Sequence, residues 1–169
     1  NWFVSLKVIC KYRFMKKYFL LAAVIAAVDQ ALKAMICFYP EGRVIWSVPP
    51  LFELYRTTNT GAAFSMMSSK TVVVAVISSV LMLALCVLLA RSRSCSRLFC
   101  VSLSVLLGGG IGNLIDRVIW GGVTDYIRLL FIRFPVFNFA DICITVSVAV
   151  LFVLICFDHK MDKPEEHHG

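Results

Sequence analysis

Four long runs of apolar residues dominate the pattern of the chain. They cover residues 18–38, 71–90, 98–115 and 138–157. Each is close to the ~20 residues that a helix rising roughly 1.5 Å per residue needs to cross a hydrocarbon core of about 30 Å. The pattern therefore predicts a membrane α-helical fold with four transmembrane helices, and four crossings place both ends of the chain on one side of the membrane.

The connections between the runs carry weaker signals. Residues 43–48 and 51–57 are rich in β-branched and aromatic residues, which predicts two short strands around Pro49 and Pro50. Residues 58–64 contain Asn and Gly, which predicts a loop. In the other long connection, a turn signal at residues 121–125 precedes an apolar piece that suits the membrane interface.

Positive charge is distributed unevenly between the two sides. Ten of the 17 Lys and Arg residues precede the first run, lie in residues 91–97 or follow the last run, against six in the longer opposite connections. Since cytoplasmic segments are enriched in Lys and Arg, both termini are predicted to be cytoplasmic. We expect one membrane domain over residues 18–157, with outer segments 39–70 and 116–137, a basic cytoplasmic segment 1–17 and a polar cytoplasmic tail 158–169.

Composition narrows the class of protein. The chain of 169 residues is 60% hydrophobic with a mean hydropathy of +0.84, against roughly 45–50% apolar residues in soluble domains. The net charge of +7 is accounted for by topology, so no nucleic-acid partner is expected. The seven cysteines are interpreted as small apolar packing residues rather than as disulfide partners or metal ligands.

Polar residues near the ends of the runs have structural explanations when each is taken alone. Asp29 and Lys33 are one helical turn apart and could form an ion pair, with Gln30 adding a hydrogen bond. Asp116 could pair locally with Arg117 at a helix end. The three glycines at 108–110 favour close helix packing.

Asp141 and Asp125 also have structural explanations. Asn138 is a good N-cap, and Asp141 three residues later resembles the acidic arm of a capping box. Asp125 could be an ordinary turn aspartate. However, all these polar residues fall near the outer membrane surface, and one shared layer is typical of an active site or a permeation path.

The available chemistry is limited. The three histidines, His159, His167 and His168, all lie in the tail, which argues against histidine-based nucleophiles and zinc sites. Two nearby carboxyl groups can share one proton, so that the charged one activates water while the neutral one donates to a peptide carbonyl. That chemistry is aspartic proteolysis, and it needs no metal and no cofactor.

Five motifs, in order along residues 18–157, resemble those of the lipoprotein signal peptidases, also called signal peptidase II. They are D29-Q-A-L-K33, N59-T-G-A-A-F64, G112-N-L-I-D-R117, V123-T-D125 and F134-P-V-F-N-F-A-D141. The resemblance implies a bacterial inner-membrane aspartic peptidase that removes signal peptides from prolipoproteins, cutting before a cysteine that carries diacylglycerol. It also implies a small periplasmic β-cradle on the four helices, an active site near the periplasmic surface, contact with membrane lipid and inhibition by globomycin.

The resemblance also implies roles for individual residues. Asp125 and Asp141 would be the catalytic pair. The remaining positions would bind substrate, orient the pair, support the site or leave room near it: Asp29, Lys33, Asn59, Gly61, Ala63, Asn113, Asp116, Arg117, Asn138 and Ala140. An opening that faces the bilayer between helices is expected for a substrate that is itself anchored in the membrane.

Other readings explain less of the pattern. A transporter or channel subunit would need acidic residues across the whole membrane thickness, and the cytoplasmic halves of the runs have none. A scaffold with only structural ion pairs leaves two aspartates without an obvious local basic partner. The G-x-G-D motif of other two-aspartate membrane proteases is not matched, because Asn113 stands where that motif needs Asp.

Overall fold

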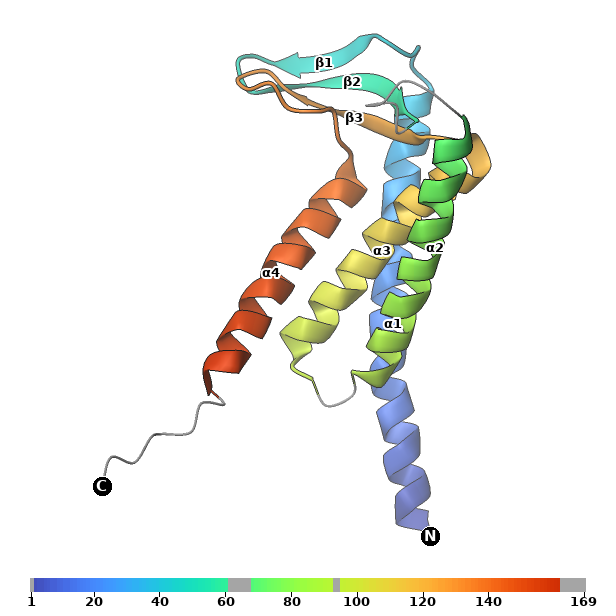
Figure 1. The fold of residues 1–169 in the computed structure, drawn as a ribbon, viewed down its shortest axis with the longest axis vertical. Helices are drawn as coiled ribbons and strands as arrows, with labels where there is room; N and C mark the ends of the chain where they lie inside the picture. The colour runs from blue at the N-terminus through green and yellow to red at the C-terminus, as the bar shows by residue number, and fades with distance from the viewer. Residues whose placement is uncertain (1, 61–67, 93–94, 162–169) are drawn as a thin grey trace, which may run out of the picture.

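The computed structural model describes residues 2–60, 68–92 and 95–161, and within these ranges the chain forms four helices and a three-stranded sheet. The elements in order are α1 (Trp2–Cys37), β1 (Val44–Val48), β2 (Phe52–Asn59), α2 (Ser68–Arg91), α3 (Arg97–Trp120), β3 (Val123–Leu129) and α4 (Phe139–Met161). The sheet lies across one end of the helices, while α1 begins and α4 ends at the opposite end (Figure 1). We call the first of these the sheet end.

Each helix contains a segment long and apolar enough to cross a membrane: Met15–Cys37, Val72–Arg91, Arg97–Trp120 and Phe139–Phe157. Many large apolar side chains on these segments are exposed, including Leu83 and Phe152. Exposed apolar surface on a helix bundle is favourable only against lipid. The structure therefore confirms the predicted architecture of four membrane-spanning helices with a small sheet.

Helix α3 is the centre of the bundle, and α1, α2 and α4 all pack on it. Glycines on α3 permit this close packing. A Cβ atom at Gly108 would lie 2.6 Å from the backbone oxygen of Ala22 in α1, and one at Gly109 would lie 2.8 Å from that of Ala140 in α4. Since backbone atoms cannot easily move away, α1 and α4 can only approach α3 this closely because side chains are missing there.

The sheet is antiparallel with the order β1-β2-β3. Strands β1 and β2 lie close to the two predicted strands, but β2 continues through Asn59, so the prediction that this residue lies in a loop was wrong. Strand β3 was not predicted, and Asp125 lies within it rather than in a turn. Its partners are residues of β2, with Asp125 opposite Thr57, and no local sequence pattern reveals a pairing over that separation.

A buried ionic cluster joins α1 to α3 near the sheet end. Lys33 Nζ lies 2.7 Å from Asp29 Oδ2 and 3.2 Å from Asp116 Oδ2. Gln30 Nε2 donates to Asp116 Oδ1 at 2.8 Å. The predicted pair of Asp29 and Lys33 is confirmed, but the pairing of Asp116 with Arg117 was wrong, because Arg117 Nη1 instead donates to the backbone oxygen of Asn113 at 3.2 Å.

The same cluster also holds β3 and α4. The backbone N–H of Thr124 in β3 donates to Asp116 Oδ2 at 3.0 Å, and that of Ala140 in α4 donates to Asp29 Oδ1 at 3.1 Å. Asp29 and Asp116 are 0% and 2% exposed, so water cannot replace these bonds. The two carboxylates therefore fix four elements relative to one another.

We expect Asp116→Asn to lower the melting temperature in detergent. The change removes one of the two negative charges facing Lys33, and a hydrogen bond to a charged group contributes about 2 kcal/mol. Thermal unfolding of the purified chain measures the effect, and the control is Glu41→Gln, an exposed position where glutamine keeps an acceptor for the Thr58 N–H and should leave the melting temperature nearly unchanged. Unchanged melting with loss of the proteolysis that the sequence resemblance implies would instead place Asp116 in the catalytic machinery.

Candidate active site

The N-terminus of α4 carries a reciprocal capping box. Asp141 N–H donates to Asn138 Oδ1 at 3.0 Å, and Asn138 N–H donates to Asp141 Oδ2 at 3.1 Å. This is the pairing that the sequence predicted for these two residues. The bonds place the Asp141 carboxyl group beside the first turn of the helix, where the helix dipole favours negative charge.

Asp125 projects from β3 and is 2% exposed. Its two oxygens accept hydrogen bonds from two amides: Asn59 Nδ2 donates to Oδ2 at 3.0 Å and Asn138 Nδ2 donates to Oδ1 at 2.7 Å. Asn138 thus bonds Asp125 through its side chain and Asp141 through its backbone. A single residue ties the strand that carries one carboxyl group to the helix that carries the other.

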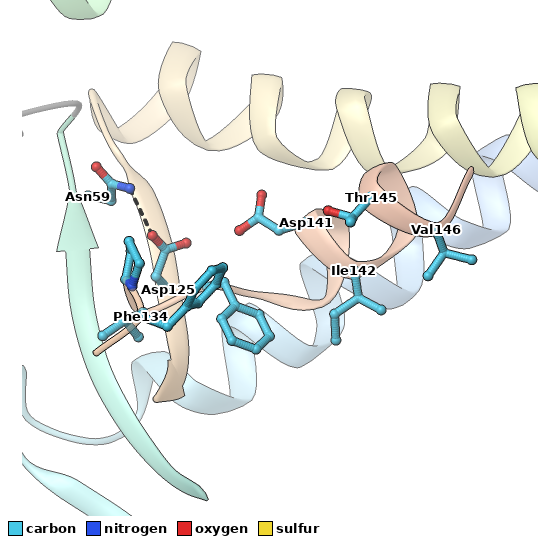
Figure 2. Close-up of a pocket in the computed structure, with 10 residues that line it drawn as sticks. Asn59, Asp125, Phe134, Asp141, Ile142, Thr145 and Val146 are labelled. Atoms are coloured by element: carbon cyan, nitrogen blue, oxygen red, sulfur yellow. Dashed lines mark hydrogen bonds between the residues drawn. The ribbon is translucent and has the colours of Figure 1, made fainter. Parts of the chain in front are cut away.

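Asn113 on α3 completes the arrangement. Its Nδ2 donates to Asp141 Oδ1 at 2.8 Å, while its Oδ1 accepts from Asn138 Nδ2 at 3.1 Å and from Lys33 Nζ at 2.9 Å. Each of the four carboxyl oxygens of Asp125 and Asp141 therefore accepts a hydrogen bond. Figure 2 shows the two carboxyl groups facing each other.

Both carboxyl groups lie on the wall of one cavity of about 500 Å³. The cavity is lined by Asn59, Asp125, Phe134, Pro135, Val136, Phe137, Asp141, Ile142, Thr145 and Val146. Ile142 and Val146 are 42% and 56% exposed on the surface of α4 (Figure 2). The cavity thus extends from the paired carboxyl groups along an apolar surface of α4, in the direction away from the sheet.

Burial governs the electrostatics of Asp125. Loss of water around the carboxyl group raises its pKa to about 6; the hydrogen bond from Asn59 opposes the shift, and the neighbouring charge of Asp141 adds to it. Burial likewise raises the pKa of Tyr126, the next residue on β3, to about 12. Asp125 is therefore able to hold a proton at a pH where ordinary aspartates are ionised.

The other predicted site residues lie around this pair. Lys33, Asp29 and Asp116 form the cluster behind Asn113, and Ala140 is fully buried between that cluster and α3. Arg117 is half-buried at the sheet end of α3. Gly61 and Ala63 lie outside the described residues.

Several residues at the site were not predicted from the sequence. Tyr126 accepts a hydrogen bond from the backbone N–H of Phe139 at 3.2 Å through its hydroxyl group, which ties β3 to the start of α4. Ile142, Thr145 and Val146 line the cavity. Their spacing from Asp141, on one side of a helix, is the signal that could have identified them.

The arrangement can carry out acid–base chemistry on a water molecule and a carbonyl group. It offers two facing carboxyl groups, one of which can keep a proton, on a cavity with apolar walls. Over the described residues, no group of three Asp, Glu, His or Cys side chains could hold a metal ion.

Comparisons with known proteins agree on one family. The family model described as signal peptidase (SPase) II matches residues 21–157. The lipoprotein signal peptidase of Brevibacillus brevis is 35% identical over 86% of this chain and 99% of that protein. Those of Enterococcus faecalis and Bacillus subtilis are 34% and 30% identical, over 89% and 88% of this chain and 94% and 99% of those proteins.

Solved structures show the same fold. A bacterial membrane enzyme determined by the in meso method at 1.9 Å resolution is 28% identical and superposes with a TM-score of 0.76, over 84% of this chain and 94% of the other. A second such structure, at 2.3 Å, has a TM-score of 0.78 and 28% identity over 90% and 95% of the two chains. The chain therefore belongs to the signal peptidase II family, the lipoprotein signal peptidases, which are aspartic peptidases that cleave signal peptides from prolipoproteins.

Proposed function

We propose that Asp125 and Asp141 are the catalytic pair of this peptidase. The observation that carries the proposal is their arrangement: two carboxyl groups from different elements face each other on one cavity, and each of their four oxygens is held by a hydrogen bond. Carboxyl groups held close together share one proton, because both cannot ionise cheaply.

In this proposal, Asp125 carries the proton and Asp141 the charge. Asp141 takes a proton from a water molecule while the water oxygen attacks the carbon of the peptide carbonyl group. At the same time, Asp125 donates its proton to the carbonyl oxygen. When the tetrahedral intermediate collapses, Asp125 recovers its proton and Asp141 gives its proton to the leaving amine. The burial of Asp125 and its raised pKa support its role as the acid.

We also propose that the scissile bond is the one before a diacylglyceryl-modified cysteine. The cavity continues from the carboxyl pair along exposed apolar residues of α4, so a substrate anchored in the bilayer can enter from the side. Asn59, Asn113, Arg117 and Asn138 would orient the pair or the substrate backbone.

The orientation in the membrane is part of the same proposal. The distribution of Lys and Arg supports cytoplasmic termini, and β3 and the start of α4, which carry the two carboxyl groups, lie at the opposite end of the bundle from the start of α1 (Figure 1). The active site would then lie near the periplasmic surface of the bacterial inner membrane. The membrane peptidase domain then comprises residues 18–157, between the basic cytoplasmic segment and the polar tail.

We expect Asp125→Asn and Asp141→Asn each to abolish cleavage of a diacylglyceryl-modified prolipoprotein peptide by a folded protein. Asparagine keeps the size of the side chain but cannot exchange the proton, which costs at least about 100-fold in kcat. Cleavage is followed by mass spectrometry, and size-exclusion chromatography verifies folding. Normal turnover by either variant would exclude the assignment.

The lipid on the cysteine is expected to be required. A peptide with a bare cysteine lacks the apolar anchor that brings the scissile bond to the cavity, so we predict a large increase in KM or no cleavage. Globomycin is expected to inhibit cleavage of the lipidated peptide in competition with it. Equal rates with and without lipid, in the same micelles, would show that the cavity does not recognise the modified cysteine.

The pH dependence of kcat/KM tests the assignment of the acid. Since Asp125 must be protonated in the free enzyme, kcat/KM should fall as the pH rises through about 6. Asn59 stabilises the ionised form of Asp125, so Asn59→Leu should move this fall to higher pH. A kcat/KM that rises with pH through the same range would contradict the proposed roles.

A further inference from the structure

The side-chain amide of Asn113 stands between a buried lysine and the catalytic pair. Lys33 is 3% exposed, and its ammonium nitrogen has three acceptors: Asp29 Oδ2 at 2.7 Å, Asp116 Oδ2 at 3.2 Å and Asn113 Oδ1 at 2.9 Å. An ammonium group has three hydrogens, so each acceptor can receive one. The first two bonds neutralise charge, but the third, to an uncharged amide, needs another explanation.

That third bond determines which way the amide of Asn113 points. Its oxygen faces two donors, Lys33 Nζ and Asn138 Nδ2, and its nitrogen faces the Asp141 oxygen at 2.8 Å. A reversed amide would direct its N–H groups at two donors and its oxygen at the oxygen of Asp141. All three contacts would then be repulsive inside a buried site, where unmatched polar groups are most costly.

The fixed amide also transmits charge asymmetrically. The positive ammonium group polarises Asn113, which strengthens the hydrogen bond to Asp141. Asp141 receives a second donor from the backbone of Asn138 at the positive end of α4. Asp125 accepts from the uncharged amides of Asn59 and Asn138, and the charge of Lys33 lowers the pKa of Asp125 less than either of these hydrogen bonds does.

We propose that Lys33 is a positioning residue for peptide hydrolysis: through the amide of Asn113, it holds Asp141 as the charged, proton-accepting member of the pair. This inference rests on the proposed function of Asp125 and Asp141. Asp125 from β3 interacts with Asp141 directly, while the other ionisable groups reach it only by way of Asn113: Lys33 and Arg117 bond Asn113, and Asp29 and Asp116 pair with Lys33.

The first test is the pH profile of Asn113→Asp, measured with the full chain in micelles on the lipidated peptide. The introduced carboxyl group keeps an acceptor for Lys33, and the melting temperature measured at each pH shows whether the variant is folded there. Near neutral pH it repels Asp141, and we expect kcat to fall about 100-fold. At acidic pH the protonated group can donate to Asp141 as the amide does, so the deficit relative to wild type should shrink at least about tenfold. A deficit that is equal at every pH, or no deficit, would overturn the proposal.

The second test is a double-mutant cycle between Lys33→Met and Asn113→Leu, carried out in an Asp116→Asn background. In that background, Lys33→Met leaves Asp29 as the one charged group of the cluster. The net charge of the cluster is then −1, the same as that of Lys33, Asp29 and Asp116 together in the wild type. If Lys33 acts through Asn113, Lys33→Met should lower kcat about 10-fold when Asn113 is present and less than about 2-fold when it is replaced. An equal loss in both backgrounds would exclude the coupling.

Two controls keep the outcomes separate. Lys16→Met replaces an exposed lysine of α1 at the start of its membrane-spanning segment, away from the sheet end, and should leave kcat unchanged. Failure of the wild-type chain to cleave the lipidated peptide would refute the proposed function itself. If Lys33→Met does not fold in the Asp116→Asn background, Lys33→Gln takes its place in the cycle, because it keeps a donor for Asn113 without the charge, and the same pattern of losses decides the inference.

Discussion

The sheet end of this protein depends on one constraint: charges inside an apolar bundle must be matched by hydrogen-bond partners. Lys33, Asp29 and Asp116 satisfy it together, and their remaining lone pairs take backbone N–H groups from β3 and α4. Without these partners, burying each ion would lower the stability of the fold by about several kcal/mol, because the ion would lose its water and gain nothing in return. Isolated buried charges are rare for this reason. The need to satisfy the ions therefore also dictates where the strand and the fourth helix are placed.

Hydrogen bonds that start from the ionic cluster also hold the carboxyl pair. Asn113 connects the ionic cluster to Asp141, and Asn138 connects Asp141 to Asp125. These two asparagines suit this task because an amide donates at one end and accepts at the other, without adding charge. The glycines of α3 contribute by letting α4 approach closely enough for the amide of Asn113 to reach its partner.

Much of this arrangement could be predicted from the sequence where the signal was local. The spans follow from apolar runs, the pair of Asp29 and Lys33 from a spacing of one helical turn, and the capping box of α4 from the spacing of Asn138 and Asp141. The failures involve partners distant in the chain. Strand β3 exists because β2 pairs with it, and Asp116 faces Lys33 of another helix although Arg117 is its neighbour in sequence. Periodicity describes one element at a time, so it could not identify these contacts.

The exposed flank of the cavity has a consequence for how this enzyme meets its substrate. Ile142 and Val146 are exposed apolar residues of a helix long and apolar enough to cross a membrane, so hydrocarbon chains would cover them when no peptide is bound. On the proposed function, a lipidated peptide would enter the site by displacing bilayer lipid, and both molecules would diffuse within the plane of the membrane. The relevant concentration is the number of substrate molecules per unit area of membrane, so diluting the bilayer with inert lipid should slow the enzyme even when the bulk concentration of substrate is unchanged.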